Sequence, residues 1–178
     1  MSLKGLFVYL NTVGKHRRAV RKLCFKCGLY WQGLTHDLSK YSWTELSCGA
    51  KYSTGKYSPH VGQRKEWGYS AAWLHHKGHN KHHIEYWVDV DGSDASVAIQ
   101  MPPKYFVEMI CDRVAACKVY MGKTYTNDAP LNYYMSRNVV PHKETHRDII
   151  HFLSLLAEEN EEVLVEELKR WKRRKEGK

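Results

Sequence analysis

The apolar residues at the start of the chain recur at steps of three and four, which is the spacing of one face of an α-helix. A second segment, residues 104–122, is apolar around its whole circumference and therefore predicts a buried central helix. No segment shows the convincing alternation of a strand, so the sequence predicts an all-α fold. The first apolar stripe consists of Leu3, Leu6, Phe7, Leu10, Val13, Val20, Leu23, Cys24 and Cys27.

The length of 178 residues, of which 43% are hydrophobic, favours one helical domain with a tail. We expect a domain over residues 1–157 and a charged helical extension over residues 158–178. Apolar positions from Ile149 to Trp171 predict one long C-terminal helix. The Gly-, Ser-, Lys- and Tyr-rich residues 49–68 predict a long surface loop.

The sequence gives no sign of a membrane protein or a secreted one. No apolar run reaches the length of a membrane span, and the N-terminus lacks the apolar core and cleavage site of a secretory signal. The five cysteines lack the paired spacing of a disulfide framework. We therefore expect a cytoplasmic protein.

The positive charge is concentrated near the N-terminus. The net charge is +9, and residues 158–178 contain seven acids and seven bases, so the excess lies in residues 1–157. Seven lysines and arginines precede the first acid, Asp37. Such a patch attracts the phosphates of a nucleic acid or of a small nucleotide. The alternative is a solvated basic helix face.

Histidine and aspartate residues form a recognisable set. Asp112 interrupts the apolar helix, His36 and Asp37 are adjacent, and His16 lies in a gap of the first apolar stripe. A single core histidine is more commonly just hydrogen-bonded, but the whole set indicates a metal site held by several helices. Five further histidines crowd into nine residues, at His75, His76, His79, His82 and His83.

This order of residues resembles a known class of enzymes. The series His16, His36-Asp37-Leu38-Ser39-Lys40 and Asp112 is similar to the H…HD…D motif of the HD-domain metal phosphohydrolases, which are all-helical. The segment His82-His83-Ile84-Glu85 resembles the HHxE segment of HD subfamilies that hold two metals.

A second resemblance covers nearly the whole chain. AWLHHKGHNKHHIEYW, the stretch around Asp112, and PLNYYMSRN…HKETHRD resemble the uncharacterised family called domain of unknown function 5662. Its members are similar to HD-domain proteins and occur in bacteria and phages without an established substrate.

These resemblances imply one or two divalent ions, of Mn, Fe, Mg, Zn or Co. The first ion would be held by His16, His36, Asp37 and Asp112. The second would be held by His76 and by His82 or His83, with Asp37 as the bridge.

The resemblances also imply roles around the metal. Asp37 and Lys40 would be catalytic, and Lys40 and Lys81 would neutralise the substrate phosphate. Glu85 and Asn80 would orient a ligand histidine.

We therefore expect a metal-dependent phosphohydrolase whose substrate is a phosphate ester, namely a nucleotide or a related small molecule. The alternative is a non-catalytic basic module with a structural metal site, which binds nucleic acid through the N-terminal helix. The many tyrosines and tryptophans could serve such a module, although most lie at helical spacing and are more simply core.

Three other metal motifs are disfavoured. The segment HHKGHNKHH contains the letters of an HNH nuclease, but nine residues cannot span its ββα unit. The C-x-x-C pair Cys24 and Cys27 has no second pair and lies on the apolar stripe. The segment DVDGSDAS lacks the acidic spacing of an EF-hand.

Overall fold

The chain folds almost entirely into helices over residues 2–177, the part that the computed structural model describes. The predicted all-α class is therefore confirmed. The α-helices are α1 (Leu3–Lys26), α2 (Tyr30–Thr35), α3 (Trp43–Tyr52), α4 (Pro59–Trp67), α5 (Ala71–His79), α6 (Pro103–Met121), α7 (Ala129–Met135), α8 (Lys143–Glu158) and α9 (Glu161–Lys175). Short 3-10 helices are η1 (Leu38–Tyr41), η2 (Ile84–Tyr86) and η3 (Gly122–Thr124), and a hairpin consists of β1 (Val88–Val90) and β2 (Ser96–Ala98).

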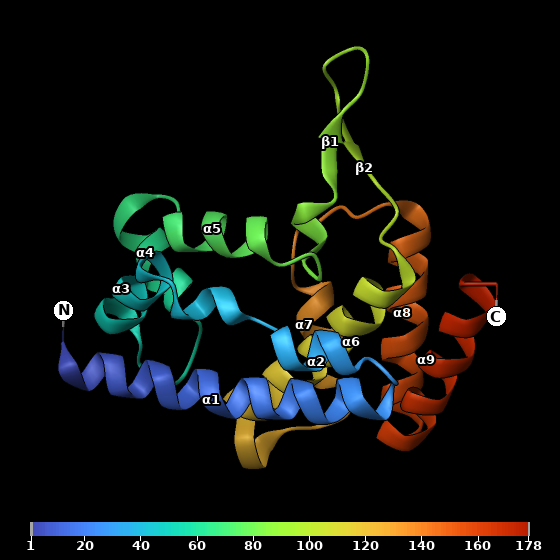
Figure 1. Cartoon of the computed structure of the whole chain (residues 1–178), viewed down its shortest axis with the longest axis horizontal. Helices are drawn as coiled ribbons and strands as arrows, with labels where there is room; N and C mark the ends of the chain where they lie inside the picture. The colour runs from blue at the N-terminus through green and yellow to red at the C-terminus, as the bar shows by residue number, and fades with distance from the viewer. Residues whose placement is uncertain (1, 178) are drawn as a thin grey trace.

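Helix α1 runs along one edge of the molecule and joins its two halves (Figure 1). Ser2 caps its start by accepting a hydrogen bond from the backbone N–H of Gly5, and Gly28 ends it with a φ of 73°. Helices α3, α4 and α5 lie over its N-terminal half, α6 packs against it, and α9 lies beyond its C-terminal end (Figure 1).

Helix α6 is the buried central helix that the sequence predicts. Phe106, Val107, Ile110 and Val114 are each at most 1% exposed. Their core also includes Leu164, Leu168 and Trp171 of α9. The expected extension at residues 158–178 therefore packs into the same core as the preceding domain.

The expected long C-terminal helix is in fact two helices. The chain turns at Glu159, and the Asn160 side chain caps α9 by accepting a hydrogen bond from Val163 N at 3.0 Å. Glu161 then pairs with Lys26 of α1 at 2.7 Å and with Lys118 of α6. The cap and these ion pairs bring α9 back against the core beside α8.

The prediction of a loop over residues 49–68 is wrong. Helix α3 continues to Tyr52, and α4 occupies Pro59–Trp67 with Pro59 in its first turn and Gly68 at its C-terminal cap. Gly, Ser and Lys made this segment look irregular, but its glycines allow close helix packing. A side chain at Gly62 would overlap Tyr52.

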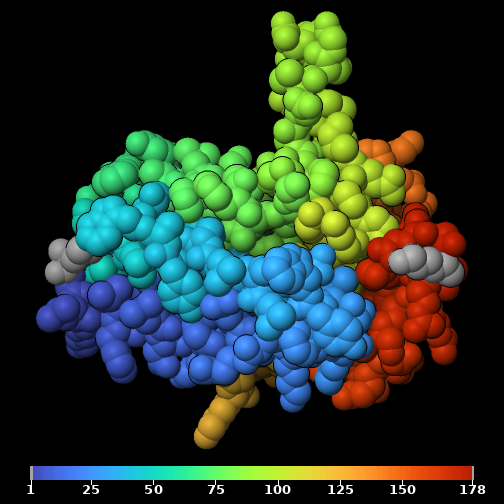
Figure 2. Space-filling view, in the orientation of Figure 1, coloured from blue at the N-terminus to red at the C-terminus, as the bar shows by residue number. Residues whose placement is uncertain are grey.

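Residues 88–98 form an antiparallel hairpin, although no segment of the sequence shows the alternation of a strand. Val88 pairs with Ala98, and the hairpin projects from the helical body (Figure 2). Its turn is closed by Asp91, whose carboxylate accepts hydrogen bonds from Ser93 and Ala95. Three-residue strands are too short for alternation to identify them.

No helix among residues 2–177 has the length and apolar character needed to cross a membrane.

Helices α1 and α3 cross at a contact that only glycine permits, and this gives a test of the packing. A Cβ at Gly49 would overlap the ring of Tyr9, which is 4% exposed. We expect Gly49→Ala to lower the free energy of unfolding by about 1–3 kcal/mol because the core is overpacked. Gly78→Ala in α5 meets nothing within 4 Å and should instead stabilise the helix by about 0.5–1 kcal/mol. Urea denaturation measures both, and equal effects of the two substitutions would contradict the crossing.

Candidate metal centre

The His36-Asp37 pair lies at a turn between two short helices, α2 and η1. Asp37 has a φ of 55°, a left-handed conformation that is uncommon outside glycine. This turn brings two consecutive side chains to the same point, with His36 Nε2 3.5 Å from Asp37 Oδ2. Arg17 of α1 holds the turn, because its guanidinium donates to the carbonyls of His36 at 2.8 Å and Leu34 at 3.0 Å.

Four side chains from three parts of the fold converge beside this turn. His16 Nε2 of α1 lies 2.9 Å from Asp112 Oδ1 of α6, 3.3 Å from His36 Nε2 and 3.6 Å from Asp37 Oδ2. Ligand atoms at about 2.1 Å from one cation are separated by about 3.0–3.4 Å. The spacing of these atoms therefore fits a single divalent ion, and the residues are those that the sequence assigned to a first ion.

The second carboxylate oxygen of Asp37 faces another group of imidazoles. Asp37 Oδ1 lies 3.3 Å from His76 Nε2 and 3.4 Å from His82 Nε2, and His83 completes a group that could hold a metal. Asp37 thus has one oxygen in each group. The structure brings together the residues expected for a second ion, with Asp37 between the two sets.

Several atoms of the second group are buried without a hydrogen bond among the described residues. They are Asp37 Oδ1, His82 Nε2 and His83 Nε2. Buried polar atoms are costly to leave unsatisfied, and a cation would satisfy a carboxylate oxygen and two ring nitrogens at once. The donor set therefore fits a metal ion.

Two further carboxylates orient the imidazoles from outside. Glu108 Oε1 lies 2.9 Å from His36 Nδ1 and 3.1 Å from His82 Nδ1, so both rings direct Nε2 inward. Glu45 lies 2.9 Å from His76 Nδ1 and 3.0 Å from His75 Nδ1. Carboxylates in this position fix the orientation of ligand histidines and raise their basicity.

The charges of the cluster keep its carboxylates ionised. Burial alone would raise the pKa of Asp37, but His36 and Lys40 hold it well below its usual range. Burial likewise opposes ionisation of Asp112, and its hydrogen bonds with His16 and His36 lower its pKa well below the ordinary value. Both acids are therefore in the form that binds cations.

The pKa values of His83 and His36 are shifted in opposite directions. Burial and the neighbouring His82 lower the pKa of His83 well below its usual value, so the ring is neutral and has a free lone pair. Burial also disfavours the charged form of His36, but Asp37 and Asp112 outweigh it and raise the pKa of His36 well above its ordinary value.

Lys40 adds a cation beside the centre. It follows Asp37 by three residues on η1, and its ammonium lies 3.4 Å from Asp37 Oδ2. Burial alone would lower the pKa of Lys40. The charges of the nearby Asp37 and Glu45 outweigh burial and raise the pKa above its ordinary value, so the ammonium stays charged.

A cavity of about 480 Å³ opens onto the cluster. Its volume lies within the range of small-molecule sites. Four cations and several aromatic rings line it together with His16, Asp37, His76, His83 and Asp112. The cations are Lys40, Lys56, Arg113 and Arg137, and the rings include Tyr9, Tyr57, Trp73, Tyr120 and Tyr133.

Three other residues were expected to contact a ligand histidine or the substrate phosphate, and the structure places the three differently from one another. Asn80 does contact a ligand histidine, since its amide lies 3.2 Å from His76 Nδ1 and donates to Ser39. Glu85 lines the cavity, but among the described residues it makes no hydrogen bond to a histidine. Lys81 is exposed against the rings of Tyr86 and Tyr105 and does not line the cavity, so we assign it no contact with a phosphate.

The two orienting glutamates were not predicted from the sequence. Glu108 lies four residues before Asp112 on α6 and hence on the same helix face, which is a signal that could have identified it. Glu45 has no comparable local signal, because its partners come from α5, thirty residues later.

Comparison with known proteins places the chain in a family. No curated protein and no solved structure matches it. The profile of the family of unknown function DUF5662 matches residues 6–158, a range that contains every side chain of the two metal groups. The chain therefore belongs to the family of unknown function DUF5662.

Proposed function

We propose that this protein is a divalent-metal-dependent phosphohydrolase that acts on a phosphate ester, a nucleotide or a related small molecule. The observation that carries the proposal is the buried Asp37 carboxylate, which has one oxygen in each of two histidine groups. The resemblance to HD-domain enzymes supports it, because the residues of that motif are the ones that converge here.

The ligands would be His16, His36, Asp37 and Asp112 for one ion, and Asp37, His76, His82 and His83 for another. A divalent cation supplies Lewis acidity to a phosphoryl oxygen and acidifies the water that attacks it. Nitrogen and oxygen ligands together suit Mn, Fe, Co or Zn, and Mg to a lesser extent.

The protein's own cations would hold the phosphate. Lys40, Arg113 and Arg137 line the same cavity as the ligands, and Arg113 Nε is buried without a hydrogen bond among the described residues. A cation fixed in a partly enclosed cavity stabilises charge that develops on a phosphoryl group. The aromatic rings of the cavity would pack against the organic part of the substrate.

The second candidate is a non-catalytic protein with a structural metal. Structural metal sites are closed by protein ligands, whereas catalytic sites keep a position open to substrate. Here the cavity reaches His16, Asp37 and Asp112 directly. This access favours catalysis.

The proposal is tested by assaying phosphate release from nucleoside mono-, di- and triphosphates and from simple phosphate esters. The purified protein is incubated in turn with Mn, Mg, Co, Fe and Zn. We expect release from at least one substrate with at least one metal. A metal-loaded protein that releases no phosphate in any combination would favour the structural-metal candidate.

The metal site itself is tested by a double variant, Asp37→Ala with Asp112→Ala. Removing both carboxylates takes away the bridging ligand and the anionic charge, so the metal content should fall to background. Elemental analysis of protein purified without chelator measures it. The control, Asp89→Ala with Glu162→Ala, removes two exposed acids and should keep the metal of the parent. Unchanged metal in the Asp37/Asp112 variant would refute the site.

Substitution of Lys40 distinguishes an effect on turnover from an effect on metal binding. Because its ammonium is charged and lines the cavity, Lys40→Ala should lower kcat by about a hundredfold while the metal content is retained. The matched control is Lys81→Ala, which removes an exposed lysine outside the cavity and should have the kcat of the parent. Equal kcat in all three proteins would exclude a role for Lys40 in the reaction, and loss of metal would make its role structural.

A further inference from the structure

The outer surface of α1 and α2 carries positive charge with no acid of its own. Residues 2–36 contain seven lysines and arginines and no Asp or Glu. Lys26 is paired with Glu161, and the Arg17 guanidinium is committed to the carbonyls of the His36 turn. Arg18 and Arg21 are exposed and form no ion pair within residues 2–177. Their charge is available to a partner.

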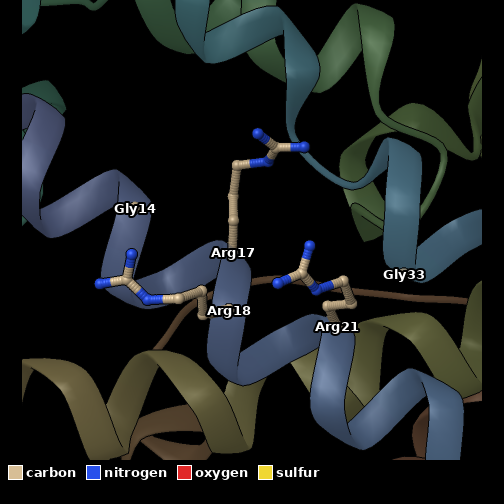
Figure 3. A pocket seen from close by; sticks show the side chains of 5 residues that line it. All are labelled: Gly14, Arg17, Arg18, Arg21 and Gly33. Atoms are coloured by element: carbon tan, nitrogen blue, oxygen red, sulfur yellow. The ribbon is translucent and has the colours of Figure 1, made fainter.

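These arginines border a pocket between α1 and α2. It has a volume of about 260 Å³ and is lined by Gly14, Arg17, Arg18, Arg21 and Gly33. Figure 3 shows the three guanidinium groups around it. A Cβ at Gly14 would lie 3.7 Å from Arg18 Nη1, an ordinary contact distance, so a side chain at this position would stand beside that guanidinium. None of these residues lines the cavity at the metal centre, so this is a separate site.

Exposed aromatic rings lie on the same short helix as Gly33. Sequence spacing assigned most aromatic residues to the core, but Tyr30 is 63% and Trp31 72% exposed. The ring of Phe25 on α1 packs edge-on against Tyr30, with centroids 5.3 Å apart. The helix that borders the charged pocket through Gly33 therefore also carries two large exposed rings, and exposed aromatic rings are characteristic of a binding surface.

We propose that this surface binds single-stranded nucleic acid, with a backbone phosphate between Arg18 and Arg21 and a base stacked on Trp31. A guanidinium presents a planar fork of donors that matches phosphate oxygens. An exposed indole ring stacks with any base, which gives affinity without sequence preference. The two features together fit a polyanion that also has free aromatic faces.

The structure disfavours two other polyanions. A duplex offers phosphates to the arginines, but its bases are already stacked and cannot pack on Trp31. An anionic membrane requires the apolar face of a basic helix. On α1, the apolar residues next to these arginines, Val20, Leu23 and Cys24, are buried in the core, and Phe25 is 37% exposed.

The test measures the fluorescence anisotropy of a labelled single-stranded oligothymidylate bound to the full-length protein at several salt concentrations. Arg18→Gln with Arg21→Gln should weaken binding at least tenfold and flatten the slope of log K against log salt by about 0.7, for the one phosphate that the two arginines neutralise. Trp31→Ala should weaken binding about tenfold with the slope unchanged, and Trp31→Tyr should restore most of the affinity.

The control variant, Arg173→Gln with Arg174→Gln, removes the same charge from exposed positions of α9 and should bind like the parent. A second probe of the pocket is Gly14→Glu, which adds a carboxylate beside Arg18 in the middle of α1 and should weaken binding as the arginine variant does. Circular dichroism establishes that each variant is folded.

Three results would overturn the proposal. One is an equal loss of affinity in the α9 control, which would mean attraction by net charge alone. Another is binding of the corresponding duplex as tight as that of the single strand, with no effect of Trp31→Ala. The third is tighter binding to phosphatidylserine vesicles than to the oligonucleotide, with the same dependence on Arg18 and Trp31.

Discussion

The buried carboxylate of Asp37 is the constraint around which the rest of the structure is arranged. It is 2% exposed, and an unpaired charge at such a position costs several kcal/mol. Its partners come from different elements: His16 from α1, Lys40 from η1, His76 from α5 and His82 from the turn that follows. Three separated segments, which contain residue 16, residues 37–40 and residues 76–82, must therefore meet at one carboxylate, and the helices that carry them must pack accordingly.

Helix α6 shows how an apolar helix can serve this centre. It is buried on nearly every side, yet it carries Glu108 and Asp112 one turn apart. Asp112 faces His16 directly, and Glu108 holds the outer nitrogens of His36 and His82. Two acids that would destabilise an ordinary core helix are satisfied because both point at imidazoles. The core and the site are thus one packing arrangement.

The features that could be predicted from the sequence are those marked by the spacing of nearby residues or by the order of a known motif. Apolar spacing identified α1 and α6, and the series from His16 to Asp112 identified residues that the structure brings together. The helix at Pro59–Trp67 and the hairpin at residues 88–98 were missed, because a polar helix and three-residue strands have weak periodicity. Glu45 and the cavity arginines could not be predicted either, since only the packing of distant helices gives them partners.

Three consecutive residues of α1 illustrate how one helix serves several purposes. His16 points inward to Asp112, Arg17 reaches across to the carbonyls that shape the His36 turn, and Arg18 borders the outer pocket. Successive side chains on a helix diverge by about 100°, so neighbours in sequence necessarily reach different surroundings. Arg17 contacts both environments, because it lines the outer pocket while its hydrogen bonds hold the left-handed turn at Asp37. The position of α2 relative to α1 therefore sets both the width of that pocket and the direction of the Asp37 carboxylate.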